Sequence, residues 1–149
     1  MIGADAIRDA LASYRDAIRY VVSETVAGMN AGLDPVSIAH GMTLPEALAD
    51  KPFLQEFYGS VAYASRAYFA GTLGWFDGNP TSLGQLPATV TSRNYIALAG
   101  GAEKLLAAAQ EALDAGNAQW SMELVDHLLA ADEETEGARA LKITALRTL

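Results

Sequence analysis

Apolar residues in the first thirty positions recur at steps of three and four, the period of a helix that buries one face. The stripe consists of Ile7, Leu11, Tyr14, Ile18, Val21, Val22, Thr25, Val26 and Met29. It predicts one long amphipathic helix from Asp5 to about Met29, ended by Gly32 in a left-handed cap and by Pro35. Long two-sided helices at a terminus are common oligomerisation devices. We therefore expect residues 1–32 to form a helical arm that joins two copies into a homodimer.

Proline and glycine divide the middle of the chain into shorter segments. Asp34-Pro35 supplies the cap and first position of a short helix at 36–40, and Leu44-Pro45 repeats the device for a helix at 46–50. Longer helices are predicted at 61–73 and 88–99. Between them, residues 74–80 read as an Asx-type turn with Gly and Pro, and residues 81–87 as a loop.

The last third of the chain has the most regular helical pattern. Helices are predicted at 102–115, 118–130 and 135–149, separated by Gly116-Asn117 and by Asp132-Glu133-Glu134, which would cap the third helix. Residues 102–149 are thus tetratricopeptide-like, although an ordinary antiparallel helix hairpin explains them equally well. No credible strand is found. The expected fold is all-α, a helical bundle with a long N-terminal helix, forming a single domain over 1–149.

Eight of the twelve aromatic residues lie between Phe53 and Phe76. Large rings bury much area per residue, so this segment is expected to be a packing centre. A second interpretation is an apolar pocket for a small molecule or peptide. Its candidate lining residues are Tyr63, Tyr68 and Trp75.

The composition argues against several classes of function. The net charge of −8, spread along 149 residues, argues against nucleic acid, because phosphate binding requires clustered Lys and Arg. No run of apolar residues approaches the length of a membrane span, and no secretion signal is visible at the N-terminus, so a cytoplasmic location is expected. Cysteine is absent, which excludes disulfides and thiol chemistry.

Candidate catalytic chemistry is sparse. The two histidines, His40 and His127, lack partners at the spacing of a metal motif. No serine has a nucleophile-elbow context, and no Gly-rich loop follows a strand. We expect no catalytic residue, no metal site and no cofactor in this chain, which would not be catalytic alone.

One resemblance to a known family follows from two motifs and several shorter matches. Phe53-Leu54-Gln55-Glu56-Phe57-Tyr58-Gly59-Ser60-Val61, followed by Leu73-Gly74-Trp75-Phe76-Asp77-Gly78-Asn79-Pro80, resembles the dimerisation domain of bacterial alkyl sulfatases. Tyr14 to Ile18, Met29 to Leu33, Gly100 to Lys104 and Leu124 to Leu128 agree with the same family in order. The resemblance covers nearly the whole chain.

The resemblance implies an all-helical domain that builds a homodimer by helical arms and forms part of an active-site wall. In that family it follows a zinc-dependent metallo-β-lactamase-like domain, which carries the zinc ligands, and none of that signature occurs in this chain. The implied function is therefore a dimerisation or scaffold domain of a sulfate-ester hydrolase. The alternative is a contribution to an alkylsulfatase active site completed by a separate metallo-β-lactamase domain.

Two positions depart from the family pattern. Tyr63 occupies the place of a family histidine proposed to act in sulfate-ester cleavage, and Gly71 the place of a family arginine. Gly71 can supply no charge for an anionic sulfate, which leaves Arg66 as the nearest cation on the same predicted helix. The resemblance thus makes Tyr63 and Arg66 substrate-pocket candidates, beside Tyr68 and Trp75, while making an ordinary alkylsulfatase role harder to support.

Overall fold

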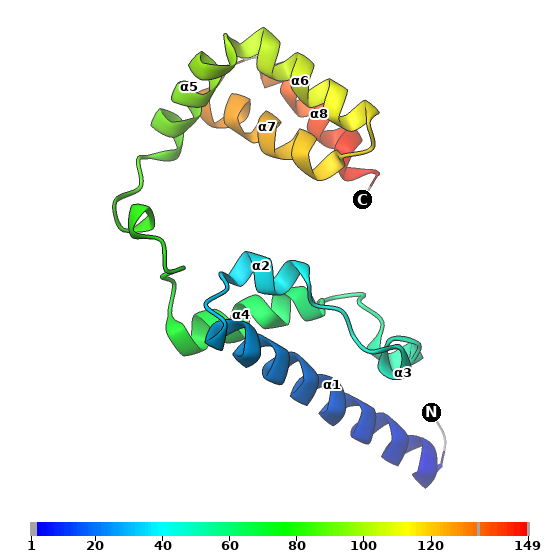
Figure 1. Cartoon of the computed structure of the whole chain (residues 1–149). Helices are drawn as coiled ribbons and strands as arrows, with labels where there is room; N and C mark the ends of the chain where they lie inside the picture. The colour runs from blue at the N-terminus through cyan, green and yellow to red at the C-terminus, as the bar shows by residue number, and fades with distance from the viewer. Residues whose placement is uncertain (1–2, 134, 149) are drawn as a thin grey trace. The chain divides into compact units, whose positions relative to one another are not determined.

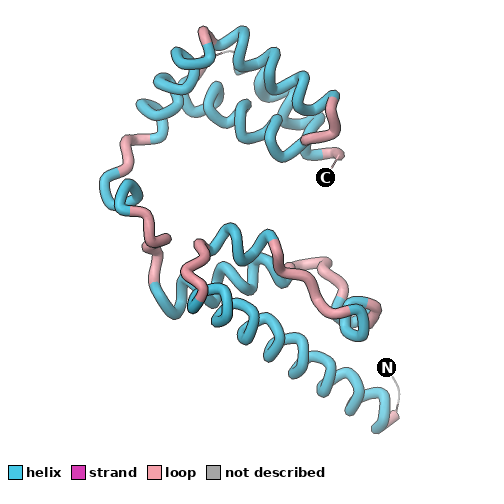
Figure 2. The backbone as a smooth tube through the Cα atoms, in the orientation of Figure 1, coloured by secondary structure: helices cyan, strands magenta, loops and turns pink. Residues whose placement is uncertain are grey.

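The computed structural model describes residues 3–133 and 135–148, and within them every regular element is helical (Figures 1 and 2). The prediction of an all-α chain is therefore confirmed. The chain divides into two compact units, Met1–Gly84 and Gln85–Leu149. The prediction of a single domain over 1–149 stays a prediction.

The first unit contains four α-helices. These are α1 (Ala4–Asn30), α2 (Pro35–His40), α3 (Glu46–Ala49) and α4 (Val61–Leu73), with 3₁₀ turns η1 (Pro52–Leu54) and η2 (Pro80–Gly84). The predicted helices agree with these bounds to within a residue, and 61–73 agrees at both ends. The predicted loop over 81–87 instead begins with η2. Helix α4 packs against both α1 and α2.

Glycine residues with positive φ lie near the predicted ends of two helices. Gly32 has φ +74° two residues after α1 ends, and Gly74 has φ +85° directly after α4, a region that favours glycine. The turn that follows α4 has Asx character, because the Asn79 N–H donates to Asp77 Oδ1 at 2.8 Å. The Ser82 hydroxyl donates to Asp77 Oδ2 at 2.8 Å, and this hydrogen bond closes the turn.

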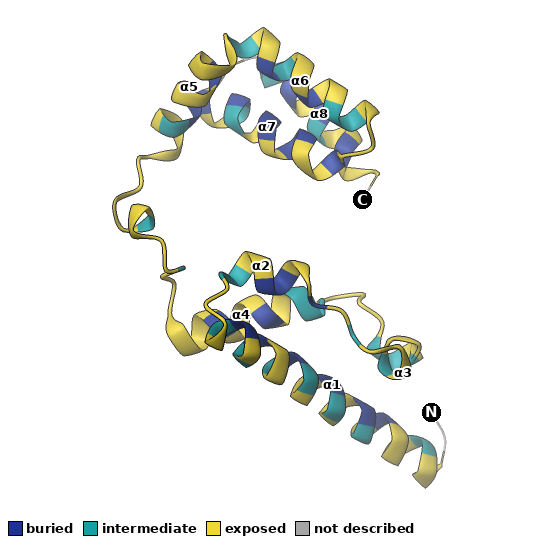
Figure 3. Cartoon of the chain, viewed as in Figure 1, coloured by how far each residue is buried: buried dark blue, intermediate teal, exposed yellow. Residues whose placement is uncertain are grey.

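The buried face of α1 differs from the predicted stripe. Its buried residues are mostly small: Ala10, Ser13, Ala17, Val21, Thr25 and Gly28. Only Val21 and Thr25 belong to the predicted stripe, and Figure 3 shows the buried positions as a narrow line along the helix. Small residues allow neighbouring backbones to approach closely. The periodicity of the large apolar side chains instead indicated the adjacent face of the helix. The predicted helix is confirmed, and within this unit it buries the face adjacent to the predicted stripe.

A polar contact between α1 and α4 crosses the core of this unit. Thr25 Oγ1 lies 2.6 Å from the Val21 carbonyl oxygen and 2.9 Å from Ser65 Oγ, and both side chains are fully buried. Buried hydroxyl groups are costly unless they are hydrogen-bonded, and these two satisfy each other. The contact therefore fixes the register of α4 against α1.

Gly28 lies at a close contact between α1 and α2. A Cβ built there would lie 2.6 Å from Ile38 Cγ1, next to the branch point of a buried side chain. Gly71 provides a matched comparison, because it lies within α4 and a Cβ there would meet no atom within 4 Å.

Gly28→Ala is expected to destabilise the first unit by about 1–3 kcal/mol, because an added methyl overpacks this contact. Gly71→Ala is expected to stabilise it by about 0.5–1 kcal/mol, since alanine is the better helix former. Urea denaturation followed by circular dichroism measures both. Equal effects of the two substitutions would contradict the close approach.

Asp34 caps the N-terminus of α2. One carboxylate oxygen accepts from the backbone N–H groups of Val36 and Ser37 at 2.8 and 3.0 Å, and the Ser37 hydroxyl bonds to the other oxygen. The Ser37 hydroxyl, followed by the backbone N–H groups, holds the pKa of Asp34 below its usual value. Hydrogen bonds to the charged form thus favour ionisation.

The folded pKa of Asp34 lies below the unfolded one. The cap therefore stabilises α2 fully above the unfolded value of about 4 and loses this contribution as the pH falls through the folded pKa. We expect amide exchange at Val36 and Ser37, corrected for intrinsic rates, to accelerate below this range. Asp34→Ser keeps a capping oxygen without the charge, so its exchange should lack this pH dependence. Identical profiles for the two proteins would refute the assignment.

The second unit contains α5 (Ala88–Ala99), α6 (Ala102–Asp114), α7 (Ala118–Ala131) and α8 (Thr135–Leu146). Helix α7 lies at its centre and packs against the other three. Its core is formed by Ile96, Leu105, Ala109, Leu124, Val125, Leu128, Ala131, Ala138 and Leu141. All four helices were predicted to within a few residues, while their tetratricopeptide-like character stays a prediction.

One capping assignment in this unit needs correction. Asp132 was predicted to begin the last helix, but it has φ +60° and ends α7 in the left-handed conformation. Aspartate tolerates this region better than most residues because its short polar side chain can bond locally. The predicted contribution of Glu134 lies outside the described residues.

Candidate functional site

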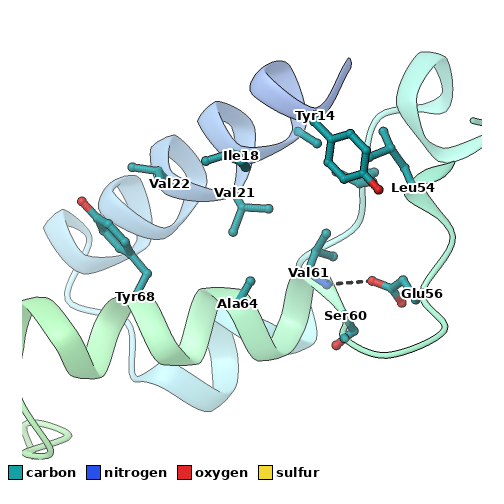
Figure 4. A pocket seen from close by; sticks show the side chains of 13 residues that line it. Tyr14, Ile18, Val21, Val22, Leu54, Glu56, Ser60, Val61, Ala64 and Tyr68 are labelled. Carbon is teal, nitrogen blue, oxygen red and sulfur yellow. Dashed lines mark hydrogen bonds between the residues drawn. The ribbon is translucent and has the colours of Figure 1, made fainter. Parts of the chain in front are cut away.

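An apolar hollow of the first unit lies between α1 and α4, and we call it the α1–α4 groove. It has a volume of about 390 Å³. Figure 4 shows α1 forming one wall, α4 the other, and the segment before α4 closing one end. It is lined by Tyr14, Ala17, Ile18, Val21, Val22, Leu44, Leu54, Glu56, Gly59, Ser60, Val61, Ala64 and Tyr68.

Polar groups gather at one end of the groove, where α4 begins. The Val61 N–H donates to Glu56 Oε1 at 2.7 Å (Figure 4). The Tyr63 N–H donates to Ser60 Oγ at 3.1 Å. These side chains cap α4, which explains their position next to the first helical turn. No lysine or arginine lines the groove. Its apolar walls and single carboxylate suit an apolar occupant without negative charge.

The segment of residues 51–54, which contributes Leu54 to the groove, is fixed to α1 by three interactions. The Tyr14 hydroxyl donates to the Phe53 carbonyl oxygen at 2.6 Å, and the two rings stack with centroids 5.8 Å apart. Lys51 Nζ pairs with the Asp9 carboxylate at 3.0 Å. A segment without long helices is thereby held against α1, and the groove has a defined end.

The four predicted pocket residues are not brought together. Tyr68 lines the groove at the end opposite Glu56, beside Val22 (Figure 4). Tyr63 and Arg66 lie one turn apart on α4, are exposed, and do not line it. Trp75 follows the helix and contacts the Phe76 ring edge-on, with centroids 6.0 Å apart. Their role in a pocket stays a prediction.

The segment rich in aromatic residues is not the packing centre that was predicted. Only Phe69 is buried, whereas Phe57 and Trp75 are 82% and 73% exposed. The physical reason is that α4 buries one face, through Ser65 and Phe69, and most of the other rings lie on its outer face or on the flanking loops. Exposed rings that gather along a short segment are more typical of a contact surface than of a core.

A second apolar surface lies on α1 itself. Ile7, Leu11, Tyr14 and Ile18 form what we call the α1 stripe, and all four are exposed. Leu11 and Ile18 are 66% and 62% exposed. Sequence periodicity identified these residues as part of the apolar stripe of a helical arm. Tyr14 and Ile18 also line the α1–α4 groove, so the two surfaces are continuous.

His127 lies in the second unit, where its imidazole is half-buried. Nδ1 is 3.1 Å from Ser92 Oγ, and the ring packs on Tyr95 with centroids 4.7 Å apart. The imidazole is thus packed in the fold and partly open to solvent. Among residues 3–133 and 135–148, no group of three or more His, Cys, Asp or Glu side chains could hold a metal ion. No helix in that part of the chain is long and apolar enough to cross a membrane.

The chain is similar in sequence to a known protein family and to several known proteins. Residues 34–149 match the family described as alkyl sulfatase dimerisation. A linear primary-alkylsulfatase of a Pseudomonas species is 38% identical over 148 residues, which cover 99% of this chain and 28% of that enzyme. An (R)-specific secondary-alkylsulfatase of Pseudomonas is 34% identical, with 99% and 22% covered. Both matches include α1, which precedes the family match.

Solved structures agree with these relatives. The structure of the stereoselective inverting sec-alkylsulfatase Pisa1 from Pseudomonas is similar with a TM-score of 0.94 at 33% identity. The similarity covers 99% of this chain and 24% of that one. The chain therefore spans about a quarter of the length of the proteins it matches.

Proposed function

Because this chain belongs to the alkyl sulfatase dimerisation family, we propose that it joins two copies of an alkylsulfatase-type enzyme through the α1 stripe. The observation that carries the proposal is the exposure of Ile7, Leu11, Tyr14 and Ile18 along one side of a 27-residue helix. Contiguous exposed apolar residues mark interaction surfaces. A C2 dimer would place the same stripe of both copies in the interface.

The hydrolytic chemistry would then belong to another part of the enzyme. The relatives are named as alkylsulfatases, and the chain spans about a quarter of their length. We propose that a metallo-β-lactamase-like domain supplies the zinc site, and that this chain contributes no cofactor. Gly71 in place of the family arginine supports a structural role here, since it offers no cation to a sulfate group.

Light scattering on the purified chain at micromolar concentration tests the proposal. We expect a particle of twice 15.7 kDa. A mass of 15.7 kDa at every concentration would count against self-association through this chain.

A second candidate function is a contribution to a sulfate-ester active site. Tyr63 and Arg66 favour it, because they lie one turn apart on the exposed face of α4 and carry a hydroxyl and a cation. Its test is dodecyl sulfate hydrolysis by a metallo-β-lactamase-like domain with and without this chain, using Tyr63→Phe and Arg66→Gln. No rate gain over the metal domain alone would eliminate this function.

A further inference from the structure

We propose that the exposed side of helix α8 is an accessory binding surface for a long-chain alkyl sulfate. The surface consists of Arg139, Ile143, Leu146 and Arg147, and we call it the α8 face. This site lies in the second unit, and it rests on the proposed function in one respect, the alkylsulfatase type of the enzyme. The expected ligand is a single amphiphile with an anionic sulfate head and an apolar alkyl tail.

The geometry of α8 places these side chains on one side of the helix. Ile143 lies four positions after Arg139, and the other two residues lie three and four positions after Ile143, so the side chains are neighbours on the helix surface. All four are exposed, with Ile143 and Leu146 at 52% and 56%. The opposite side packs against α6 and α7. Its buried residues are Ala138, Leu141 and Ala145.

Positive charge is concentrated on this part of an acidic chain. Residues 137–148 contain three cations and no acidic residue, whereas the whole chain has a net charge of −8. Lys142 lies beside the α8 face and pairs with Asp126 on α7, and Glu136 precedes Arg139 by one turn. Arg139 and Arg147 form no ion pair within 4 Å in residues 3–133 and 135–148. Their guanidinium groups are therefore available to an external anion.

The α8 face combines the two contacts that an alkyl sulfate needs. A guanidinium group binds an oxyanion through two parallel hydrogen bonds. Ile143 and Leu146 lie between the two arginines along the chain and offer apolar area to the methylene groups of the tail. The α1–α4 groove offers only the apolar contact, because no cation lines it. The α8 face therefore suits the intact anionic amphiphile better than the groove does.

The acidity of the whole chain favours a single amphiphile over a membrane surface as the ligand. An extended anionic surface interacts with the summed charge of the chain, which is −8, and would repel it. A single alkyl sulfate responds mainly to charges within the screening length, about 8 Å at physiological ionic strength. Its local field is then set by the cations on α8 rather than by the net charge.

Isothermal titration calorimetry of the purified chain with decyl sulfate, kept below its micelle-forming concentration, tests the proposal. The double variant Arg139→Gln/Arg147→Gln is expected to weaken binding by about tenfold or more, because it removes both charged donors from exposed positions. Arg19→Gln/Arg93→Gln is the charge-matched control, since these arginines are exposed on α1 and α5. It should bind like the wild type, and both double variants should keep the wild-type helical content.

Replacing one apolar residue tests the contact with the tail. Ile143→Ser is expected to weaken decyl sulfate binding by about fivefold, because it removes part of the apolar area that the tail would cover. Leu98→Ser is the matched control, as Leu98 is exposed on α5, and it should bind like the wild type. Equal effects of the two serine substitutions would contradict a tail seated on α8.

Amide chemical shifts of an isotope-labelled chain locate the ligand independently of its affinity. Decyl sulfate is expected to shift the amides of residues 139–147 in the wild type and not in Arg139→Gln/Arg147→Gln. Shifts confined to the α1–α4 groove, or equal affinity of the wild type and this variant, would overturn the inference. Binding of phosphatidylglycerol vesicles without binding of decyl sulfate would identify a membrane contact and overturn it as well.

The outcomes separate this site from the proposed self-association. A wild-type chain that is monomeric at every concentration, yet binds decyl sulfate on the α8 face, would contradict the dimer and support this site. A wild-type dimer that binds no decyl sulfate on this face would support the dimer and overturn this site.

Discussion

Replacing Leu11 with glutamate is expected to convert the self-associated chain to a monomer across the micromolar range. Leu11 is the most exposed residue of the α1 stripe, and a symmetric interface would bury it twice. Each buried leucine contributes about 1.5–3 kcal/mol, so the two copies contribute about 3–6 kcal/mol, or about 10²–10⁴-fold in Kd. Burying an unpaired carboxylate adds to this cost.

The control for this prediction is Ser23→Glu, which places the same charge on another exposed side of α1. It should associate like the wild type, and both variants should keep the helical content of the wild-type chain. Sedimentation velocity over a concentration series measures the difference. Equal association of Leu11→Glu and the wild type would exclude the α1 stripe from the interface.

Replacing Leu128 with alanine is expected to destabilise the second unit by about 2–5 kcal/mol. Leu128 on α7 is fully buried and belongs to the core that α7 shares with the other three helices of this unit. Truncation would leave a cavity in the middle of that core, which neighbouring side chains fill only in part. Chemical denaturation followed by circular dichroism measures the change in free energy of unfolding.

Leu98→Ala is the matched control, since Leu98 on α5 is 83% exposed in the isolated chain. Its effect should stay within about 0.5 kcal/mol. The result that would contradict the described core is a Leu128→Ala protein as stable as Leu98→Ala.

The positions of the helices could be predicted because local chemistry determines them. Asp34 followed by proline begins α2, and Gly74 with its positive φ ends α4. Such caps act within one turn, so their signal is contained in a few neighbouring residues. The exact agreement at 61–73 has this origin, with Ser60 as the cap.

The buried faces could not be predicted with the same success. Contacts across the fold determine which side of a helix is covered, and close approach at Gly28 favours small residues over large ones. The periodicity of large apolar residues therefore indicated the stripe with Leu11 and Ile18, although both are exposed within this unit. For the same reason, the density of rings between Phe53 and Phe76 did not indicate a core.

The α1–α4 groove was predicted only through Tyr68. Its walls come from α1, from α4 and from the segment containing Leu54 and Glu56, which lie far apart in the sequence. Their juxtaposition depends on contacts such as Tyr14 with Phe53, which no local pattern encodes. The absence of a cofactor, the cytoplasmic location, the single-domain organisation and the pocket roles of Tyr63, Arg66 and Trp75 stay predictions.

Self-association through α1 is the central claim, and sedimentation equilibrium of the wild-type chain beside Leu11→Glu tests it most directly. The wild type is expected to fit a particle of twice 15.7 kDa that dissociates on dilution, and Leu11→Glu is expected to fit 15.7 kDa at every concentration. A wild-type chain that fits 15.7 kDa throughout, or a Leu11→Glu chain that fits the doubled mass, would contradict the claim.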